Sequence, residues 1–307
     1  MTVVDWLGRS VSYIRSEGVR QGLAISAGEF KQGAAYRLDK RVSGDSIFDY
    51  EWDMLVILDA CRPDLLEEVA EDYDFLPNEP ATIRSKGSGS RTWMDRNFTS
   101  EWRSEIENTA YVTGNPYSDD YVNPGQFAHL DEVWRYAWDD DQGTVPARSI
   151  TDRAIDTART HNPDRLLVHY MQPHFPSIPD PIGSGIDIET FGKWESVWDD
   201  LESGEIATER VWESYRKNLE YVLEDVELLL ENVNAENTII SADHGNAFGE
   251  LGFYGHPPHN PLPCLRRVPW VETYASDENS YEPNEERQTV NVSDSDVESR
   301  LEDLGYL

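Results

Sequence analysis

Four short apolar runs recur along the chain, at residues 54–58, 110–113, 166–170 and 238–242. They are bounded by glycine, proline or polar residues, which is typical of strands that are buried on both faces. Between them, apolar residues recur at spacings of three and four, which predicts helices over residues 150–160 and about 209–233. Strands separated by helices favour an α/β fold with a doubly wound, mostly parallel central sheet that is flanked by helices.

The same pattern divides the chain into three parts. Residues 1–45 predict a helical, loop-rich lead-in, residues 46–275 a single core, and residues 276–307 an acidic excursion followed by a short helix. Val4, Leu7, Val11 and Ile14 give the start of the lead-in an amphipathic period. Such a helix packs on the core, or it lies on a membrane or a partner. Residues 176–207 lack a clear period and predict an inserted loop.

Charge narrows the setting of the protein. The chain holds 59 acidic residues against 26 basic ones, for a formal net charge of -33, and its ten Trp and 15 Tyr residues indicate a packed core rather than a disordered acidic segment. Such a charge destabilises a compact state at low salt, but at molar salt the screening length is only about 3 Å. We therefore expect a protein from a halophilic archaeon, and the net charge disfavours nucleic acid and anionic membranes as partners.

The sequence contains no transport or disulfide signal. It has two cysteines, no basic and apolar leader at its start, and no uninterrupted apolar run of the length that a membrane-spanning helix needs. These features predict a cytoplasmic protein, with peripheral membrane contact through the first helix as the alternative.

Acidic and histidine side chains stand where two of the predicted strands end. Asp59 directly follows the first strand, and Asp243 and His244 follow the fourth strand before a glycine. Open α/β sheets bind ligands at this carboxyl edge. Carboxylate and imidazole groups without thiolates suit Mn²⁺, Zn²⁺ or Mg²⁺, so the pattern predicts a divalent metal.

These segments also carry a family resemblance. Residues 56–59 with Arg62 and Asp64, residues 171–176, residues 241–250 and residues 267–270 occur in one order over about residues 52–272, and residues 301–306 close the chain. Together they resemble the sulfatase-like branch of the alkaline phosphatase superfamily. The resemblance implies an alkaline phosphatase-like core and a metal-dependent enzyme.

A glycine-serine turn at residues 85–93 offers the nucleophile that such chemistry needs. A hydroxyl at a helix N-terminus beside a metal ion loses its proton more easily than a free hydroxyl. The resemblance places the nucleophile in this segment, at Ser88, Ser90 or Thr92. We favour Thr92, which directly precedes the apparent helix and matches the threonine of the family's phosphotransferases, with Ser90 as the alternative.

Other candidate residues divide by context. His174 lies just past the third strand, where a family member places a substrate-facing histidine, and Arg62 is a candidate for an anionic substrate or for an ion pair with Asp64. His256 and His259 lie in a proline-rich loop and are candidates for a second cation, for phosphate binding, or for a plain surface loop. His169, inside a strand, reads as a core histidine.

Two departures from family patterns refine the expected function. Residues 169–174 lack the acid of the two-zinc phosphatases, so one metal ion is expected and a second remains open. Cys61 begins a pattern like the sulfatase signature but has Leu65 where arginine is required. We therefore expect a hydrolase or transferase of small-molecule, glycan or lipid phosphate esters. The alternatives are a sulfate ester hydrolase and a non-catalytic binding module.

Overall fold

The computed structural model describes residues 9, 12–13, 15–16, 18–182, 197–284 and 294–304. Its centre is a seven-stranded sheet of described residues in the order β2-β9-β6-β1-β5-β3-β4. The strands are β1 (Met54–Leu58), β2 (Ala81–Arg84), β3 (Thr109–Thr113), β4 (His129–Glu132), β5 (Arg165–Tyr170), β6 (Ala235–Ser241) and β9 (Arg267–Ala275). β9 is antiparallel to both of its neighbours and the other pairs are parallel, which confirms the predicted mostly parallel sheet.

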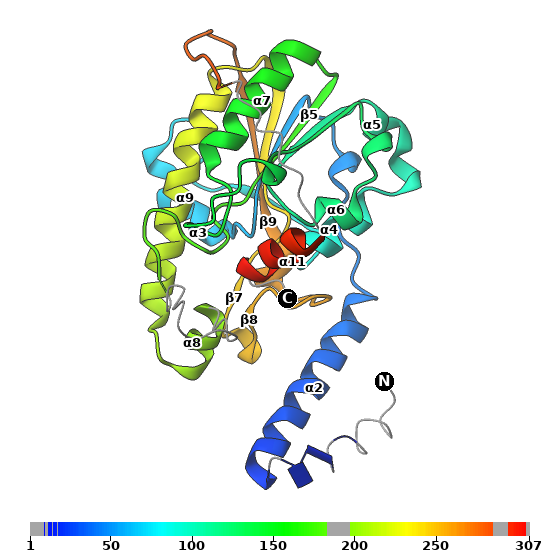
Figure 1. Ribbon diagram of the computed structural model, residues 1–307, viewed down its shortest axis with the longest axis vertical. Coiled ribbons are helices and arrows are strands. Elements are labelled where there is room, and N and C mark those ends of the chain that lie inside the picture. The colour runs from blue at the N-terminus through cyan, green and yellow to red at the C-terminus, as the bar shows by residue number, and fades with distance from the viewer. Residues whose placement is uncertain are drawn as a thin grey trace.

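Helices cover both faces of this sheet (Figure 1). One side carries α3 (Pro63–Val69), α7 (Ala147–His161) and α9 (Thr208–Leu230), and the other carries α4 (Ser90–Asn97), α5 (Arg103–Glu107) and α6 (Ser118–Tyr121). The apolar stripe predicted for the long helix is fully buried in α9, as at Val211, Leu219 and Val226. The architecture is therefore doubly wound, as the alternation of periods indicated.

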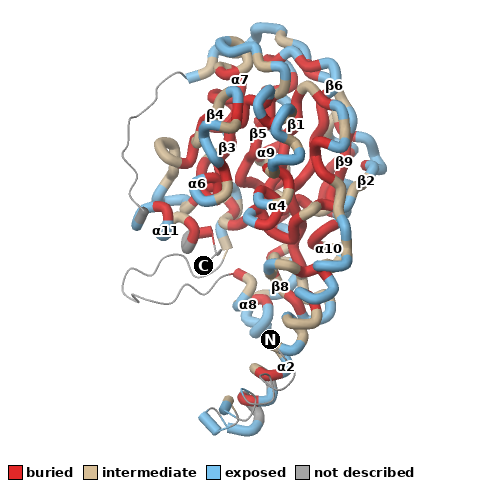
Figure 2. The backbone as a smooth tube through the Cα atoms, turned by 90° about the vertical axis from the view of Figure 1, so that its right-hand side faces the viewer, coloured by how far each residue is buried: buried red, intermediate tan, exposed pale blue. Residues whose placement is uncertain are grey.

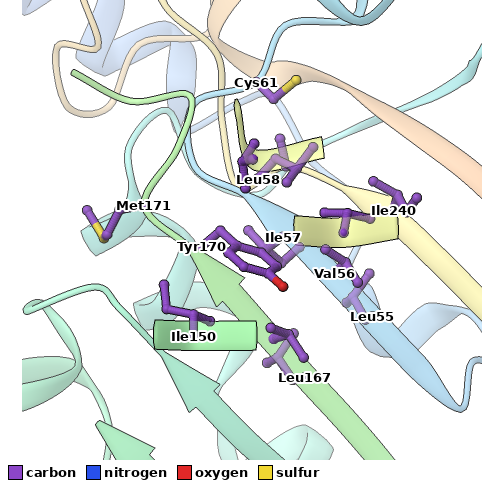
Figure 3. Close-up of a cluster of buried hydrophobic side chains, with 14 of the residues drawn as sticks. Leu55, Val56, Ile57, Leu58, Cys61, Ile150, Leu167, Tyr170, Met171 and Ile240 are labelled. Atoms are coloured by element: carbon purple, nitrogen blue, oxygen red, sulfur yellow. The ribbon is translucent and has the colours of Figure 1, made fainter. Parts of the chain in front are cut away.

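The core lies around the central strands. All five residues of β1 have no exposed surface, because parallel strands in the middle of a sheet are covered on both faces. Figure 3 shows β1 side chains between Tyr170 and Leu167 of β5 and Ile240 of β6. This packing fixes the positions at which β1, β5 and β6 end.

Three strands were missed by the sequence pattern. β2 and β4 are short and largely polar, and β9 contains Pro269, which normally argues against a strand. Pro269 pairs with Thr82 of β2, and its carbonyl accepts a hydrogen bond from the Ser241 hydroxyl at 2.7 Å.

Smaller elements lie at the carboxyl end of the sheet and beyond it. A hairpin of β7 (Ala247–Phe248) and β8 (Tyr254–Gly255), α8 (Val197–Ser203) and α10 (Pro263–Arg266) follow the core strands, and α11 (Asp294–Asp303) ends the described chain. In the lead-in, α2 (Val19–Asp39) extends away from the body, as both views show (Figures 1 and 2). The stripe expected at Val4, Leu7, Val11 and Ile14 lies outside the described residues.

Candidate active site

Three buried side chains meet where the central strands end. Asp59 follows β1, Asp243 follows β6, and His169 lies near the end of β5, which is the strand beside β1. One ligand atom of each lies within 4.8 Å of the other two, and all three residues are buried. His169 Nε2 lies 3.7 Å from Asp59 Oδ2 and 3.8 Å from Asp243 Oδ2. This group can hold a metal ion.

His244 completes the cluster on the other side of the two carboxylates. Its Nε2 lies 3.4 Å from Asp59 Oδ1 and 3.5 Å from Asp243 Oδ2. Burial alone would lower the pKa of His244, but the carboxylates of Asp243 and Asp59 raise it to about 9. Burial likewise opposes ionisation of Asp59, yet the nearby imidazoles of His169 and His244 hold its pKa well below the ordinary value. Two buried carboxylates thus require a compensating positive charge, which a proton or a metal ion can supply.

The orientation of the side chains fits a metal ion. Asp243 Oδ1 accepts hydrogen bonds from the backbone N–H groups of Ala60 at 3.0 Å and His244 at 2.9 Å, whereas its Oδ2 is buried and has no hydrogen-bond partner. His169 Nδ1 lies 3.0 Å from the Tyr111 hydroxyl, and its Nε2 likewise has no partner. Both groups are therefore anchored on their outer side and present a lone pair to the centre, as ligating residues do.

The hydroxyls of Ser90 and Thr92, the two favoured of the three candidate nucleophiles, lie in different places. Ser90 is the first residue of α4, and its hydroxyl donates to Asp59 Oδ2 at 3.2 Å and lies 3.4 Å from His244 Nε2. Thr92 instead donates to the Gly89 carbonyl at 2.9 Å and accepts from the Ser88 N–H at 3.2 Å. The structure thus brings Ser90 to the carboxylate and histidine cluster, while Thr92 closes the turn that precedes it.

His174 and His256 form a second pair beside this cluster. Their Nε2 atoms are 2.9 Å apart, and the centres of their rings lie 6.5 Å and 4.8 Å, respectively, from the ring of His244. Burial is the main cause that lowers the pKa of both imidazoles, and the charge of nearby His244 lowers them further. Two neutral imidazoles thus face one another at the mouth of the site.

Two other candidates from the sequence face away from the cluster. Arg62 forms a two-point ion pair with Asp64, a further pair with Glu250 at 2.7 Å, and packs over the Trp212 ring. His259 lies 3.7 Å from Asp39, with Nδ1 as the nearest atom, in a separate group of charged residues. The structure does not bring either residue to the metal group.

A cavity of about 290 Å³ opens beside Ser90. Tyr117, Trp198 and Tyr254 contribute aromatic surface to its wall, and Arg91 contributes a positive charge. His256 also lines it, so the cavity reaches the histidine pair. Asp199 adds a negative charge to the wall, so Arg91 is the group that an anionic ligand can contact, and the aromatic surface suits an organic body.

Sequence reasoning missed two residues of the site. Asn115 donates from Nδ2 to Asp59 Oδ2 at 2.8 Å and so orients that carboxylate, while His169 was read as a core histidine. Asn115 directly follows Gly114, at the end of the β3 segment, so its place after a strand was a usable signal. His169 required knowing that β5 lies beside β1, because its burial alone is also that of a core residue.

Comparison with known proteins gives structural neighbours alone, since no protein-family model and no curated protein matches the chain. The soluble domain of lipooligosaccharide phosphoethanolamine transferase A from Neisseria meningitidis is 12% identical, with a TM-score of 0.49 over 74% of this chain and 77% of that one. The periplasmic domain of EptC from Escherichia coli, in complex with Zn, is 10% identical, with a TM-score of 0.47 over 79% and 78% of the two chains.

A third neighbour is the lipoteichoic acid synthase LtaP from Listeria monocytogenes. It is 14% identical, with a TM-score of 0.43 over 80% of this chain and 72% of that one. At identities this low and TM-scores below 0.5, the activity of this chain has to be argued from its own residues.

Proposed function

We propose that this chain is a metal-dependent hydrolase or transferase of phosphate esters that uses Ser90 as its nucleophile. The observation that carries the proposal is the position of the Ser90 hydroxyl, which lies at the start of α4 and within 3.2 Å of Asp59 and 3.4 Å of His244. A helix N-terminus favours the ionised oxygen, and an adjacent metal ion favours it further.

Asp59, Asp243 and His244 would hold the metal ion, with His169 as a further nitrogen ligand. Mn²⁺, Zn²⁺ and Mg²⁺ all fit a donor set of carboxylate and imidazole groups. When bound, the ion supplies positive charge that favours the ionised serine and offsets the charge of the phosphoryl oxygens. A second ion held by His256 with His174 is the alternative to a role of this pair in phosphate binding, and His259 has no place in it.

The residues of the chain perform a two-step transfer. In the first step the Ser90 oxygen, having lost its proton, forms a bond to phosphorus as the bond from phosphorus to the ester oxygen breaks, and the departing alcohol takes up a proton. In the second step a water molecule or an acceptor hydroxyl attacks the phosphoserine, and Ser90 recovers its proton. The first acceptor gives a hydrolase and the second a transferase.

His256, which lines the cavity, would face the phosphate oxygens, and His174 would orient it. The Nε2 atoms of the two rings are 2.9 Å apart, and His174 Nδ1 donates to the Phe175 carbonyl. The aromatic wall formed by Trp198 and Tyr254 would contact the organic part of a small-molecule, glycan or lipid ester. Arg62 has no role in substrate binding in this proposal, because it forms ion pairs with Asp64 and Glu250.

Sulfate ester chemistry through a modified cysteine has no support at this site. Cys61 is fully buried, and burial raises the pKa of its thiol far above the ordinary value. A thiol in that state is inert rather than reactive. Cys264 lies on α10, outside the metal group.

A panel of phosphate and sulfate esters tests the proposal, with protein loaded in turn with Mn²⁺, Zn²⁺ and Mg²⁺. We expect turnover of phosphate esters and, after rapid acid quenching, a phosphoryl group on Ser90 by peptide mass spectrometry. Turnover of sulfate esters alone, or a phosphoryl group on Thr92, would overturn it. Absence of turnover with every metal would favour a binding module.

A further inference from the structure

The surface of α2 is unlike the rest of the protein. Of the large apolar side chains exposed among the described residues, five of seven lie on this helix, at Val19, Leu23, Phe30, Tyr36 and Leu38. Four of the five are more than half exposed. Scattered exposed apolar residues are ordinary, whereas a concentration on one element marks an interaction site.

Four of these residues form one stripe along the helix. At about 100° per residue, Val19, Leu23, Phe30 and Leu38 fall within an arc of about 100°. Ala27 and Ala34 lie inside the same arc, so the stripe is continuous. An arc of this width is what an amphipathic helix presents to the surface that it binds.

The helix is held to the body by other faces. Asp39 pairs with Arg266 at 2.7 Å and Arg96 at 2.6 Å, and Ala35 packs in the small apolar cluster that contains Phe253. The Lys31 ammonium donates to the Gly252 carbonyl and lies 4.3 Å from the centre of the Phe253 ring.

The described residues before α2 contact a further face of the helix. The Tyr13 hydroxyl donates to Glu29 at 2.9 Å, about 130° around the helix from the middle of the stripe. With these contacts in place, the four large side chains of the stripe remain 53–64% exposed.

Charge indicates the nature of the surface that the stripe binds. Residues 1–41 contain seven basic residues (Arg9, Arg15, Arg20, Lys31, Arg37, Lys40 and Arg41) against four acidic ones (Asp5, Glu17, Glu29 and Asp39), whereas the whole chain carries a net charge of -33. The lead-in is thus positive in a strongly negative protein. Arg37 is exposed at the edge of the arc, and Arg41 is exposed just past the end of the helix.

We propose that α2 docks this protein on the surface of an anionic lipid bilayer. A helix with a basic border and an exposed stripe of large apolar residues lies in the interface of such a membrane. Leu251, which is 78% exposed in the loop that Lys31 contacts, adds an apolar side chain beside the helix. A second copy of the chain is the weaker partner, because stripe-to-stripe packing would bring two positive lead-ins together, whereas an anionic surface attracts the lead-in although the body carries the opposite charge.

The proposal agrees with the other membrane-related feature of the structure. Within the described residues, no helix combines the length and the apolar character needed to cross a bilayer. Attachment by α2 would therefore be peripheral, with the helix lying along the lipid surface rather than through it.

The loop that contacts α2 also leads to the cavity. Lys31 of α2 contacts Gly252 and Phe253 of this loop. The next residue, Tyr254, lines the cavity beside Ser90. α2, α8 and β8 lie at the same end of the molecule in both views (Figures 1 and 2). Docking would hold the cavity near lipid head groups, and this step, which rests on the proposed function, makes a lipid phosphate ester the substrate class.

Sedimentation with vesicles tests the docking without any substrate. Wild-type protein is mixed with phosphatidylglycerol or phosphatidylcholine vesicles at the lowest salt concentration at which circular dichroism shows it to be folded, because salt screens the preference for anionic lipid. We expect binding to the anionic vesicles, and a loss of about tenfold or more in Leu23→Glu/Leu38→Glu. Arg37→Glu/Arg41→Glu should lose the preference for anionic lipid.

Tyr274→Glu is the matched control. Tyr274 is 72% exposed on β9, so the change removes an exposed apolar side chain and adds an acid away from α2. This variant should bind as the wild type does. Equal binding of Leu23→Glu/Leu38→Glu and wild type would overturn the proposal. So would light scattering that shows the wild type to be a dimer and this double variant to be a monomer.

The docking and the enzymatic activity can fail separately. Vesicle binding needs no catalysis. A protein that is inactive on every ester but sediments with anionic vesicles would therefore support the docking proposal and refute the proposed function. A protein that hydrolyses soluble phosphate esters but does not bind vesicles would support the proposed function and refute the docking proposal.

Discussion

Ser90→Ala and Thr92→Ala should separate catalysis from stability. The Ser90 hydroxyl contacts Asp59 and His244, whereas the Thr92 hydroxyl contacts only the backbone of Gly89 and Ser88. Removing the first oxygen removes the attacking atom. Removing the second leaves the geometry of the attacking atom in place but weakens the turn that precedes it.

The two magnitudes follow from these contacts. Loss of the nucleophile should lower kcat by at least about a thousandfold, or about 4 kcal/mol of barrier at about 1.4 kcal/mol for each power of ten. Asp59 keeps its 2.8 Å hydrogen bond from Asn115, so the melting temperature of Ser90→Ala should change little. Thr92→Ala leaves the buried Ser88 N–H without its acceptor, which costs about 1–3 kcal/mol of unfolding free energy.

The assay is hydrolysis of an aryl phosphate under saturating metal, with melting followed by circular dichroism on the same samples. Thr92→Ser is the control, because it keeps both hydrogen bonds and should restore stability and activity together. An inactive Thr92→Ala with the wild-type melting temperature, alongside an active Ser90→Ala, would refute the assignment of roles.

Three further predictions concern the metal, the salt and the pH. Asp243→Asn and His169→Ala should each lower metal content per protein by at least about tenfold, measured by elemental analysis after dialysis, and full occupancy in both would place the metal elsewhere. Lowering KCl from molar to about 0.1 M should lower the melting temperature or precipitate the protein, because the charge of -33 is then poorly screened, and an unchanged melting curve would exclude adaptation to salt. Hydrogen bonds from Arg210 and Lys217 lower the pKa of Asp180 to about 2, so this group stabilises the fold above its ordinary pKa of 3.8 and loses that contribution as the pH falls towards 2. Asp180→Asn should therefore cost about 1 kcal/mol at pH 7 and less near pH 2, and equal costs at both pH values would contradict the ion pair.

The sequence alone determined the elements whose signal is local. The continuous apolar runs of β1, β3, β5 and β6 and the stripe of α9 could be read from periodicity, because burial on both faces or on one stripe is written into neighbouring positions. The same reasoning placed Asp59, Asp243 and His244 at strand ends. Since parallel strands end at one edge of the sheet, their proximity followed from the fold class.

The tertiary structure decided which side chains face one another. α4 begins at Ser90, three residues before the expected start, so that Ser90 meets Asp59 and Thr92 turns to the backbone. His169 joins the site because β5 lies next to β1 in the sheet, and Asn115 joins it because β3 lies next to β5. No local sequence pattern determines this order of strands.

Arg62 and His259 are residues that the sequence suggested for the site and that the tertiary structure places elsewhere. Their segments suggested a role at the site, but Asp64, Glu250 and Asp39 lie close enough to pair with them. In a chain so rich in acids, the partner of each cation depends on distances across the fold rather than on neighbours in sequence. Periodicity therefore determines which segments form the sheet, whereas the order of its strands and the rotation of its helices determine the chemistry at its edge.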